Sequence, residues 1–161
     1  MKPFFMCKNL ISENELFNPS TPYAVSRAAC EYHLINLYKS YDFPVCFTRA
    51  ANVYGPGQQL YRIVPKAILS LKLNRKLHLD GGGKSKRSFI YITDVCKATY
   101  KLCKKSINGE VYHISTSRLI SVKDLVEMIF KLKKISLKNH VKISSDRIGK
   151  DSLYSLSSKK I

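Results

Sequence analysis

Apolar residues recur at helical spacing in four stretches of the chain, and short apolar runs stand between those stretches. Side chains three and four residues apart share one face of a helix, so this spacing predicts amphipathic helices. The predicted helices cover residues 22–40, 65–73, 95–105 and 122–133. Short runs with strand-forming composition predict strands at residues 45–50, 77–79, 111–115 and 141–143.

Residues with capping preferences stand where the predicted helices begin. Thr21 is a candidate N-cap, and Pro22 follows it at the first helical position, where its missing N–H costs nothing. Pro65 is expected to open the second helix in the same way, and Asp94 is expected to cap the third. Ser121 begins a capping box before the fourth helix. On that helix the predicted core residues are Val122, Leu125, Val126, Ile129 and Leu132.

Two glycine-containing segments follow predicted strands. Residues 52–57 place two glycines around a proline, which predicts a turn. Residues 80–87 include three consecutive glycines, which free the backbone to approach a ligand. The same segment ends in cationic residues, and its arginine, Arg87, could hold a phosphate with two parallel hydrogen bonds. From composition alone, the better interpretation of residues 80–87 is a mobile hairpin tip with solvated charges.

Tyr23 and Arg27 lie four residues apart, so they share one face of the first predicted helix. A free tyrosine phenol titrates near pH ~10. A neighbouring positive charge can lower that value by roughly 1–3 units, and such a phenol can act as a general base. For these two residues alone, an ordinary aromatic residue beside a solvated arginine is the favoured interpretation.

The composition limits the class of protein. The chain has 161 residues, of which 45% are hydrophobic, enough for the core of one domain. Its formal charge of +17 is typical of a protein that binds a polyanion, but the lysines are scattered, so compositional drift explains the charge equally well. Five cysteines without a Cys-x-x-Cys pair argue against a zinc site and for a reducing compartment. No stretch approaches the ~20 apolar residues of a membrane span, so a cytoplasmic protein is expected. His113 is expected to have a surface or satisfied polar role, and no metal site is predicted.

Residues 18–29 resemble the catalytic-tyrosine helix of the extended short-chain dehydrogenase/reductases that act on nucleotide sugars, whose pattern is Pro-x-x-Pro-Tyr-x-x-Ser-Lys. Tyr23 and Ser26 fall on the tyrosine and serine, and Arg27 falls on the lysine. In that family the tyrosine is the base, and the lysine holds the nicotinamide ribose. The resemblance therefore implies catalytic and NAD-binding roles for Tyr23 and Arg27. Arginine keeps the charge of lysine but has a bulkier, planar head that does not transfer protons.

Two further motifs and a weaker third extend the resemblance to about residues 11–160. Residues 49–56 match Arg-x-x-Asn-x-Tyr-Gly-Pro, whose asparagine contacts the sugar diphosphate, which implies this role for Asn52. Residues 81–94 match the family's glycine–arginine motif, which implies that Arg87 binds the nucleotide diphosphate. Residues 146–151 are similar to a segment whose arginine helps hold the nucleotide, which implies this role for Arg147. Within the family, the resemblance is greater to dTDP-glucose 4,6-dehydratases than to 4-epimerases.

The resemblance implies an α/β fold: the C-terminal part of a Rossmann-type fold together with a smaller substrate-binding lobe. Residues 1–57 are expected to form the rear part of the nucleotide-binding domain, and residues 58–161 a substrate-binding lobe that is incomplete at its C-terminus. The family's glycine-rich NAD-binding motif is missing from the sequence. We therefore expect a truncated form that is inactive alone, and either a homodimer or a separate chain that supplies the N-terminal half.

The function implied is that of a nucleotide-sugar 4,6-dehydratase that uses NAD, with Tyr23 as the base for oxidation at C4 and a nucleotide-diphosphate sugar as ligand. One alternative is a nucleotide-sugar 4-epimerase of the same family. Another is a non-catalytic basic module that binds phosphate or nucleic acid. Against nucleic acid stands the lack of a recognisable nucleic-acid motif or of aromatic residues interleaved with basic ones. A membrane partner is not expected.

Overall fold

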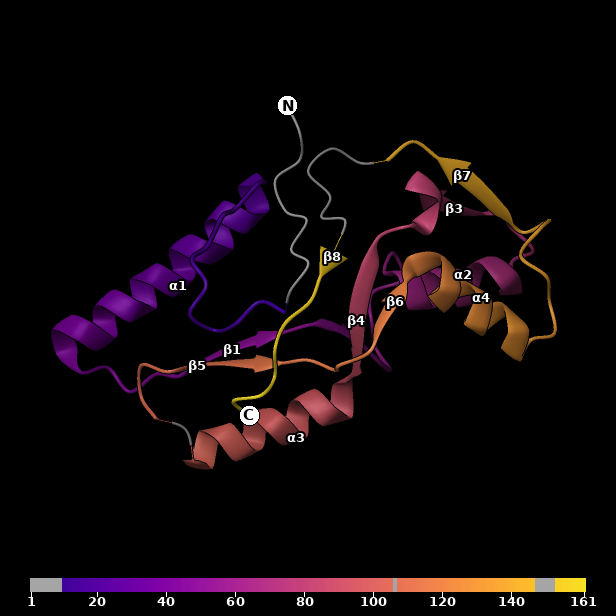
Figure 1. The fold of residues 1–161 in the computed structure, drawn as a ribbon. Coiled ribbons are helices and arrows are strands. Elements are labelled where there is room, and N and C mark those ends of the chain that lie inside the picture. The colour runs from indigo at the N-terminus through magenta and orange to yellow at the C-terminus, as the bar shows by residue number, and fades with distance from the viewer. Residues whose placement is uncertain (1–9, 106, 147–152) are drawn as a thin grey trace.

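The computed structural model describes residues 10–105, 107–146 and 153–161 (Figure 1). Its helices are α1 (Pro22–Tyr41), α2 (Ile63–Lys72), α3 (Ile92–Lys105) and α4 (Val122–Leu132), with a short 3₁₀ helix η1 (Gly81–Gly83). Its strands are β1 (Phe47–Ala50), β2 (Asn52–Tyr54), β3 (Leu77–Asp80), β4 (Lys86–Tyr91), β5 (Val111–Ile114), β6 (Leu119–Ser121), β7 (Val141–Ser144) and β8 (Leu153–Tyr154). Helices therefore alternate with strands, which confirms the predicted α/β class.

Most strand pairs are parallel. Strand β1 pairs with β5, β2 pairs with β4, and β3 pairs with β7, all in parallel. Strand β4 also pairs with β6, antiparallel, and with β8, parallel. Figure 1 shows β4 between α1 at one end of the molecule and the α2/α4 pair at the other. Because β4 joins these parts, residues on it lie near the middle of the fold.

Two clusters of buried apolar residues form the core. The first packs α3 against β2, β4 and β5 and consists of Ala51, Ile90, Leu102, Tyr112 and Ile114. The second packs α2 and α4 against β3 and consists of Ala67, Leu77, Leu79, Val126 and Phe130. Burial of apolar surface is the main favourable term in folding, so these clusters hold α3 and the α2/α4 pair against their strands.

The predicted caps of α1 and α4 are confirmed. The Thr21 hydroxyl accepts a hydrogen bond from the Ala24 N–H at 3.2 Å, and Pro22 occupies the first turn. At its other end α1 stops at Asp42, whose backbone is left-handed and whose N–H donates to the Tyr38 carbonyl. The Ser121 hydroxyl accepts from the Asp124 N–H at 3.0 Å at the start of α4.

Several local predictions are wrong. Residues 52–54 are strand β2 rather than part of a turn, because they pair with β4. Helix α2 begins at Ile63 instead of Pro65, and α3 begins at Ile92 directly after β4, which places Asp94 inside its first turn. Leu132 was predicted to lie in the core, but it is 84% exposed, whereas Phe130 in the same turn of α4 is fully buried in the second cluster.

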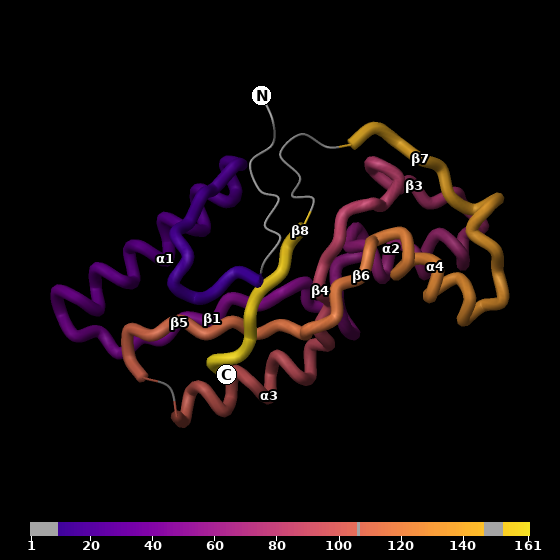
Figure 2. The backbone as a smooth tube through the Cα atoms, viewed as in Figure 1, coloured from indigo at the N-terminus to yellow at the C-terminus, as the bar shows by residue number. Residues whose placement is uncertain are grey.

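The segment that follows β8, residues 155–157, runs beside the segment before α1 (Figure 2). The Ile11 N–H donates to the Ser155 carbonyl at 3.0 Å, and the Ser157 N–H donates to the Ile11 carbonyl at 2.8 Å. Leu156 between them is buried. The two segments therefore brace each other over β5, although they are far apart in the sequence.

Candidate functional site

A cavity of about 1010 Å³ opens between α1, β2, β4 and the start of α2. Tyr23, Asn52 and Arg87, three of the predicted site residues, line it together. They come from α1, β2 and β4 respectively, and the parallel pairing of β2 with β4 brings the last two close. Arg147 lies outside the described residues, and Arg27 is not among the described residues that line the cavity.

Tyr23 stands at the rim of the cavity, in the first turn of α1. Tyr23 is 73% exposed and lines the cavity. The Ser26 hydroxyl donates to the Tyr23 carbonyl at 2.8 Å, which ties Ser26 to the helix backbone instead of to the cavity. Arg27, one turn later on the same helix, is also exposed. Both side chains are thus accessible to a ligand, and the predicted coupling between them stays a prediction.

Asn52 is fixed by strand pairing and by its own side chain. Its Nδ2 donates to the Ser88 carbonyl on β4 at 3.2 Å. Ser88 is 1% exposed, and its hydroxyl lies 2.9 Å from the Thr116 carbonyl and 3.0 Å from the Ser115 hydroxyl. This buried network joins β2, β4 and the turn after β5. This network holds Asn52 in place beside the cavity. In the sequence, only the hydroxyl residues near the strand ends hinted at such a network.

The glycine-rich segment serves packing inside the protein. Gly81 has a φ of +59°, and a Cβ atom there would lie 2.5 Å from the Asp146 carboxylate. Gly83 has a φ of +69°, and its Cβ would lie 2.9 Å from the backbone nitrogen of Lys123 at the start of α4. Glycine is required at both positions because the backbone is left-handed and its neighbours are close. These glycines therefore serve close packing before Arg87, and the approach of a ligand to their backbone stays a prediction.

The cavity is lined mainly by cations among its charged groups. In the part of the chain that the structure describes, Arg62, Lys66 and Arg87 line it, against one carboxylate, Asp80. The Asp80 carboxylate accepts a hydrogen bond from the Ser144 hydroxyl at 2.9 Å. Arg62 precedes α2 and Lys66 lies in its first turn. The sequence analysis missed both, because no local pattern showed that they line the cavity. This charge distribution suits an anionic ligand.

Two other classes of site find no support in the described residues. No group of three or more His, Cys, Asp or Glu side chains in that part of the chain could hold a metal ion. No helix there has the length and apolar character needed to cross a membrane.

His113 lies on β5 and is fully buried, so the surface alternative of the prediction is wrong. The segment containing Ile11 and the C-terminal strand cover β5, which the local pattern could not reveal. Burial lowers the pKa of His113 below its ordinary value of 6.5. The Glu13 carboxylate, 4.0 Å from Nδ1, opposes this shift, and the Arg49 cation adds to it.

The lowered pKa of His113 predicts how stability depends on pH. Below pH 6.5 the unfolded chain binds a proton on His113 that the folded chain resists, so the free energy of unfolding should fall with decreasing pH. The expected slope is at most about 1.4 kcal/mol per pH unit, down to the folded-state pKa. Urea unfolding of the wild type and His113→Gln from pH 5 to 8 measures it. Equal pH dependence in both proteins would contradict the assignment.

Comparison with known proteins shows the family to which this chain is similar. Residues 7–115 match the family model described as the NAD dependent epimerase/dehydratase family. The human dTDP-D-glucose 4,6-dehydratase is 39% identical over 148 residues, which cover 89% of this chain and 42% of that protein. The Escherichia coli dTDP-glucose 4,6-dehydratase is 28% identical over 163 residues, covering 94% of this chain and 45% of that protein. The chain thus spans less than half the length of these curated relatives.

Solved structures show the same fold. A dTDP-glucose 4,6-dehydratase from Streptomyces venezuelae with NAD bound superposes with a TM-score of 0.91 at 26% identity, covering 94% of this chain and 47% of that one. A UDP-glucuronic acid 4-epimerase from Bacillus cereus, in complex with UDP-glucuronic acid and NAD, gives a TM-score of 0.87 at 26% identity, covering 94% and 48%. The Rossmann-type fold implied by the tyrosine, asparagine and arginine motifs is confirmed, and the chain belongs to the NAD-dependent epimerase/dehydratase family.

Proposed function

We propose that this chain binds a nucleotide-diphosphate sugar and takes part in its 4,6-dehydration. The proposed substrate is dTDP-glucose. The observation that carries the proposal is the meeting of Tyr23, Asn52 and Arg87 at one cavity. The relatives support the nucleotide-sugar class, since they are named dTDP-D-glucose and dTDP-glucose 4,6-dehydratase.

The cations of the cavity have a binding role in this proposal. Arg62, Lys66 and Arg87 would attract the diphosphate, and Arg87 could bind it through two parallel charge-assisted hydrogen bonds. Asn52, held against β4 by the Ser88 carbonyl, would orient the sugar-diphosphate portion. In terms of segments, residues 1–57 would supply the tyrosine helix and Asn52, and residues 58–161 most of the cations.

Tyr23 has the chemical role. It would act as the general base that takes the proton from the C4 hydroxyl of the sugar, with the positive charge of Arg27 one turn away. Tyr23 and Arg27 also fit a nicotinamide ribose, because both are exposed on the first two turns of α1. NAD bound there would accept the hydride from C4. We extend the proposal to a homodimer or to an assembly with a separate partner chain.

A reducing cytoplasmic setting is part of the same proposal. Cys30, Cys46, Cys96 and Cys103 are free thiols, which persist in a reducing compartment.

A 4-epimerase is the second candidate. Two UDP-glucuronic acid 4-epimerase structures share the fold, with TM-scores of 0.89 and 0.87, so the fold is compatible with either reaction class. The two functions differ in product, because dehydration yields a 4-keto-6-deoxy sugar and epimerisation retains all hydroxyls. Mass spectrometry of the product distinguishes them through the loss of one water.

Calorimetric titration of the purified chain tests the proposal. We expect dTDP-glucose to bind with a dissociation constant of about 10–1000 μM, while duplex DNA binds only at low salt. The Lys97→Ala variant, altered on exposed α3 away from the cavity, should bind the sugar nucleotide like the wild type. Tight DNA binding whose affinity falls steeply with salt, without sugar-nucleotide binding, would favour the polyanion-binding alternative instead.

A further inference from the structure

The orientation of α1 determines where Tyr23 lies relative to the cavity, yet little apolar packing fixes this helix. Ala28 is its one buried residue in the described structure. Glu31 lies eight residues after Tyr23, about 12 Å farther along the helix axis. Whatever holds Glu31 therefore also sets the direction in which the first turn of α1 presents Tyr23.

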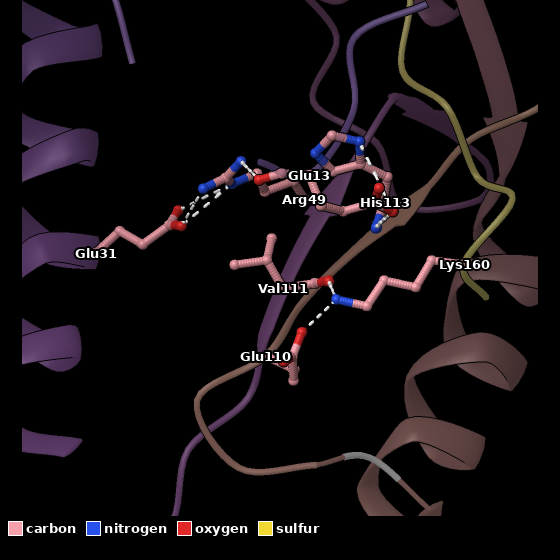
Figure 3. Close-up of polar contacts among 7 residues, drawn as sticks. All are labelled: Glu13, Glu31, Arg49, Glu110, Val111, His113 and Lys160. Carbon is pink, nitrogen blue, oxygen red and sulfur yellow. Dashed lines mark hydrogen bonds and ion pairs between the residues drawn. The ribbon is translucent and has the colours of Figure 1, made fainter. Parts of the chain in front are cut away.

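Glu31 is held by Arg49 of β1 (Figure 3). The Arg49 Nε donates to Glu31 Oε1 at 3.1 Å and to Oε2 at 3.3 Å, and Nη2 donates to Oε1 at 2.6 Å. The two side chains are only 19% and 16% exposed. A forked, shielded pair of this kind is stronger and more directional than an exposed ion pair.

The same guanidinium also contacts the segment before α1. Its Nη1 donates to the Glu13 carbonyl at 3.3 Å, and its Cζ lies 4.4 Å from the centre of the Phe17 ring. The Phe17 ring in turn meets Tyr32 of α1 edge to face, with ring centres 5.5 Å apart. Arg49 thus joins β1, α1 and the preceding segment through one planar group, which lysine could not reproduce.

The segment that contains Glu13 is itself fixed to the sheet, so its contact with Arg49 helps to fix the position of α1. The Glu13 carboxylate accepts a hydrogen bond from the His113 N–H on β5 at 3.2 Å. Ile11, two residues earlier, pairs with the C-terminal strand through Ser155 and Ser157. Arg49 on β1 pairs with His113 on β5. Both residues that Glu13 contacts therefore belong to the same sheet.

We infer that Arg49 is a positioning residue: through Glu31 and the Glu13 carbonyl, it fixes α1 on the sheet and holds Tyr23 at the rim of the cavity. The consequence for catalysis rests on the proposed function, since it requires Tyr23 to be the base. The docking of α1 by Arg49 does not rest on it. The two statements can therefore fail separately.

Hydrogen exchange of the backbone amides, followed by mass spectrometry, tests the docking. Arg49→Lys keeps the charge but loses the fork, and Glu31→Gln keeps the shape but loses the charge. Each should raise exchange in peptides from α1 about tenfold and leave peptides from α4 unchanged. The double variant should be no worse than the more affected single variant, because both substitutions remove one interaction.

Glu127→Gln is the matched control. Glu127 forms an ion pair with Lys131 on α4 at 3.0 Å, but these side chains are 41% and 72% exposed. Loss of this pair should alter exchange in no helix by more than about twofold. A uniform increase in exchange over α1 and α4 after Arg49→Lys, or no increase in α1, would overturn the inference and leave Arg49 an ordinary stabilising residue.

A second readout follows position directly. With 3-fluorotyrosine incorporated at residue 23, the ¹⁹F resonance should shift or broaden in Arg49→Lys and Glu31→Gln, and stay unchanged in Glu127→Gln. Calorimetry with dTDP-glucose on the wild type, run in parallel, separates the two ideas. Loosened α1 without any sugar-nucleotide binding would reject the proposed function and keep the positioning role. Binding with unaltered α1 exchange and ¹⁹F signal would reject the positioning role alone.

Discussion

Replacing Arg87 by alanine is expected to weaken the binding of dTDP-glucose by about 10- to 100-fold. Hydrogen bonds that involve a charged group contribute roughly 1.5–3 kcal/mol, and Arg87 lines the cavity from β4, the strand in the middle of the fold. Tyr23→Phe should change affinity less than twofold, because its phenol is expected to act on a proton instead of holding the diphosphate. Isothermal titration of both variants measures the difference.

Two controls accompany the Arg87 prediction. Arg87→Lys should lie between the wild type and the alanine variant, since lysine keeps the charge without the fork. Circular dichroism should show unchanged helix content in all variants. If Arg87→Ala and Tyr23→Phe bind dTDP-glucose with equal affinity, the division of roles between β4 and α1 is wrong.

Phe130→Ala should cause the largest loss of stability, about 3–5 kcal/mol. Phe130 is fully buried on α4, packs in one cluster with Ala67, Leu77 and Val126, and meets the His140 ring edge to face. Removing it leaves a void between α2, α4 and β3. Unfolding in urea, monitored by circular dichroism, measures the change.

Leu132→Ala is the matched control on the same helix. Leu132 is 84% exposed, so its truncation should change the free energy of unfolding by less than about 0.5 kcal/mol. Similar losses for both substitutions would show that α4 packs through a different face from the one described.

Local signals in the sequence predicted much of this fold, and long-range contacts account for the misses. Thr21 and Ser121 cap their helices as predicted, because a cap depends on residues within one turn. Strand β2, only three residues long, exists through its pairing with β4, which no local pattern encodes. His113 is buried because residues from both ends of the described chain cover β5, a contact that alternation along one strand could not predict.

The candidate site divides in the same way. The family resemblance implied site roles for Tyr23, Asn52 and Arg87, and the fold brings all three to one cavity. The contributions of Arg62 and Lys66 depend on how α2 is set against β2, so they became visible only in three dimensions. The ion pair between Arg49 and Glu31 likewise joins a strand to a helix that precedes it in the chain.

The most direct measurement of the central claim is the footprint of dTDP-glucose in hydrogen exchange. If the cavity holds the sugar nucleotide, its addition should slow exchange in peptides that cover residues 52–66 and 85–92, where Asn52, Arg62, Lys66 and Arg87 lie. Exchange in peptides from the lysine-rich helix α3 should not change. Slowed exchange confined to α3, or none anywhere at saturating ligand, would contradict the assignment of the cavity.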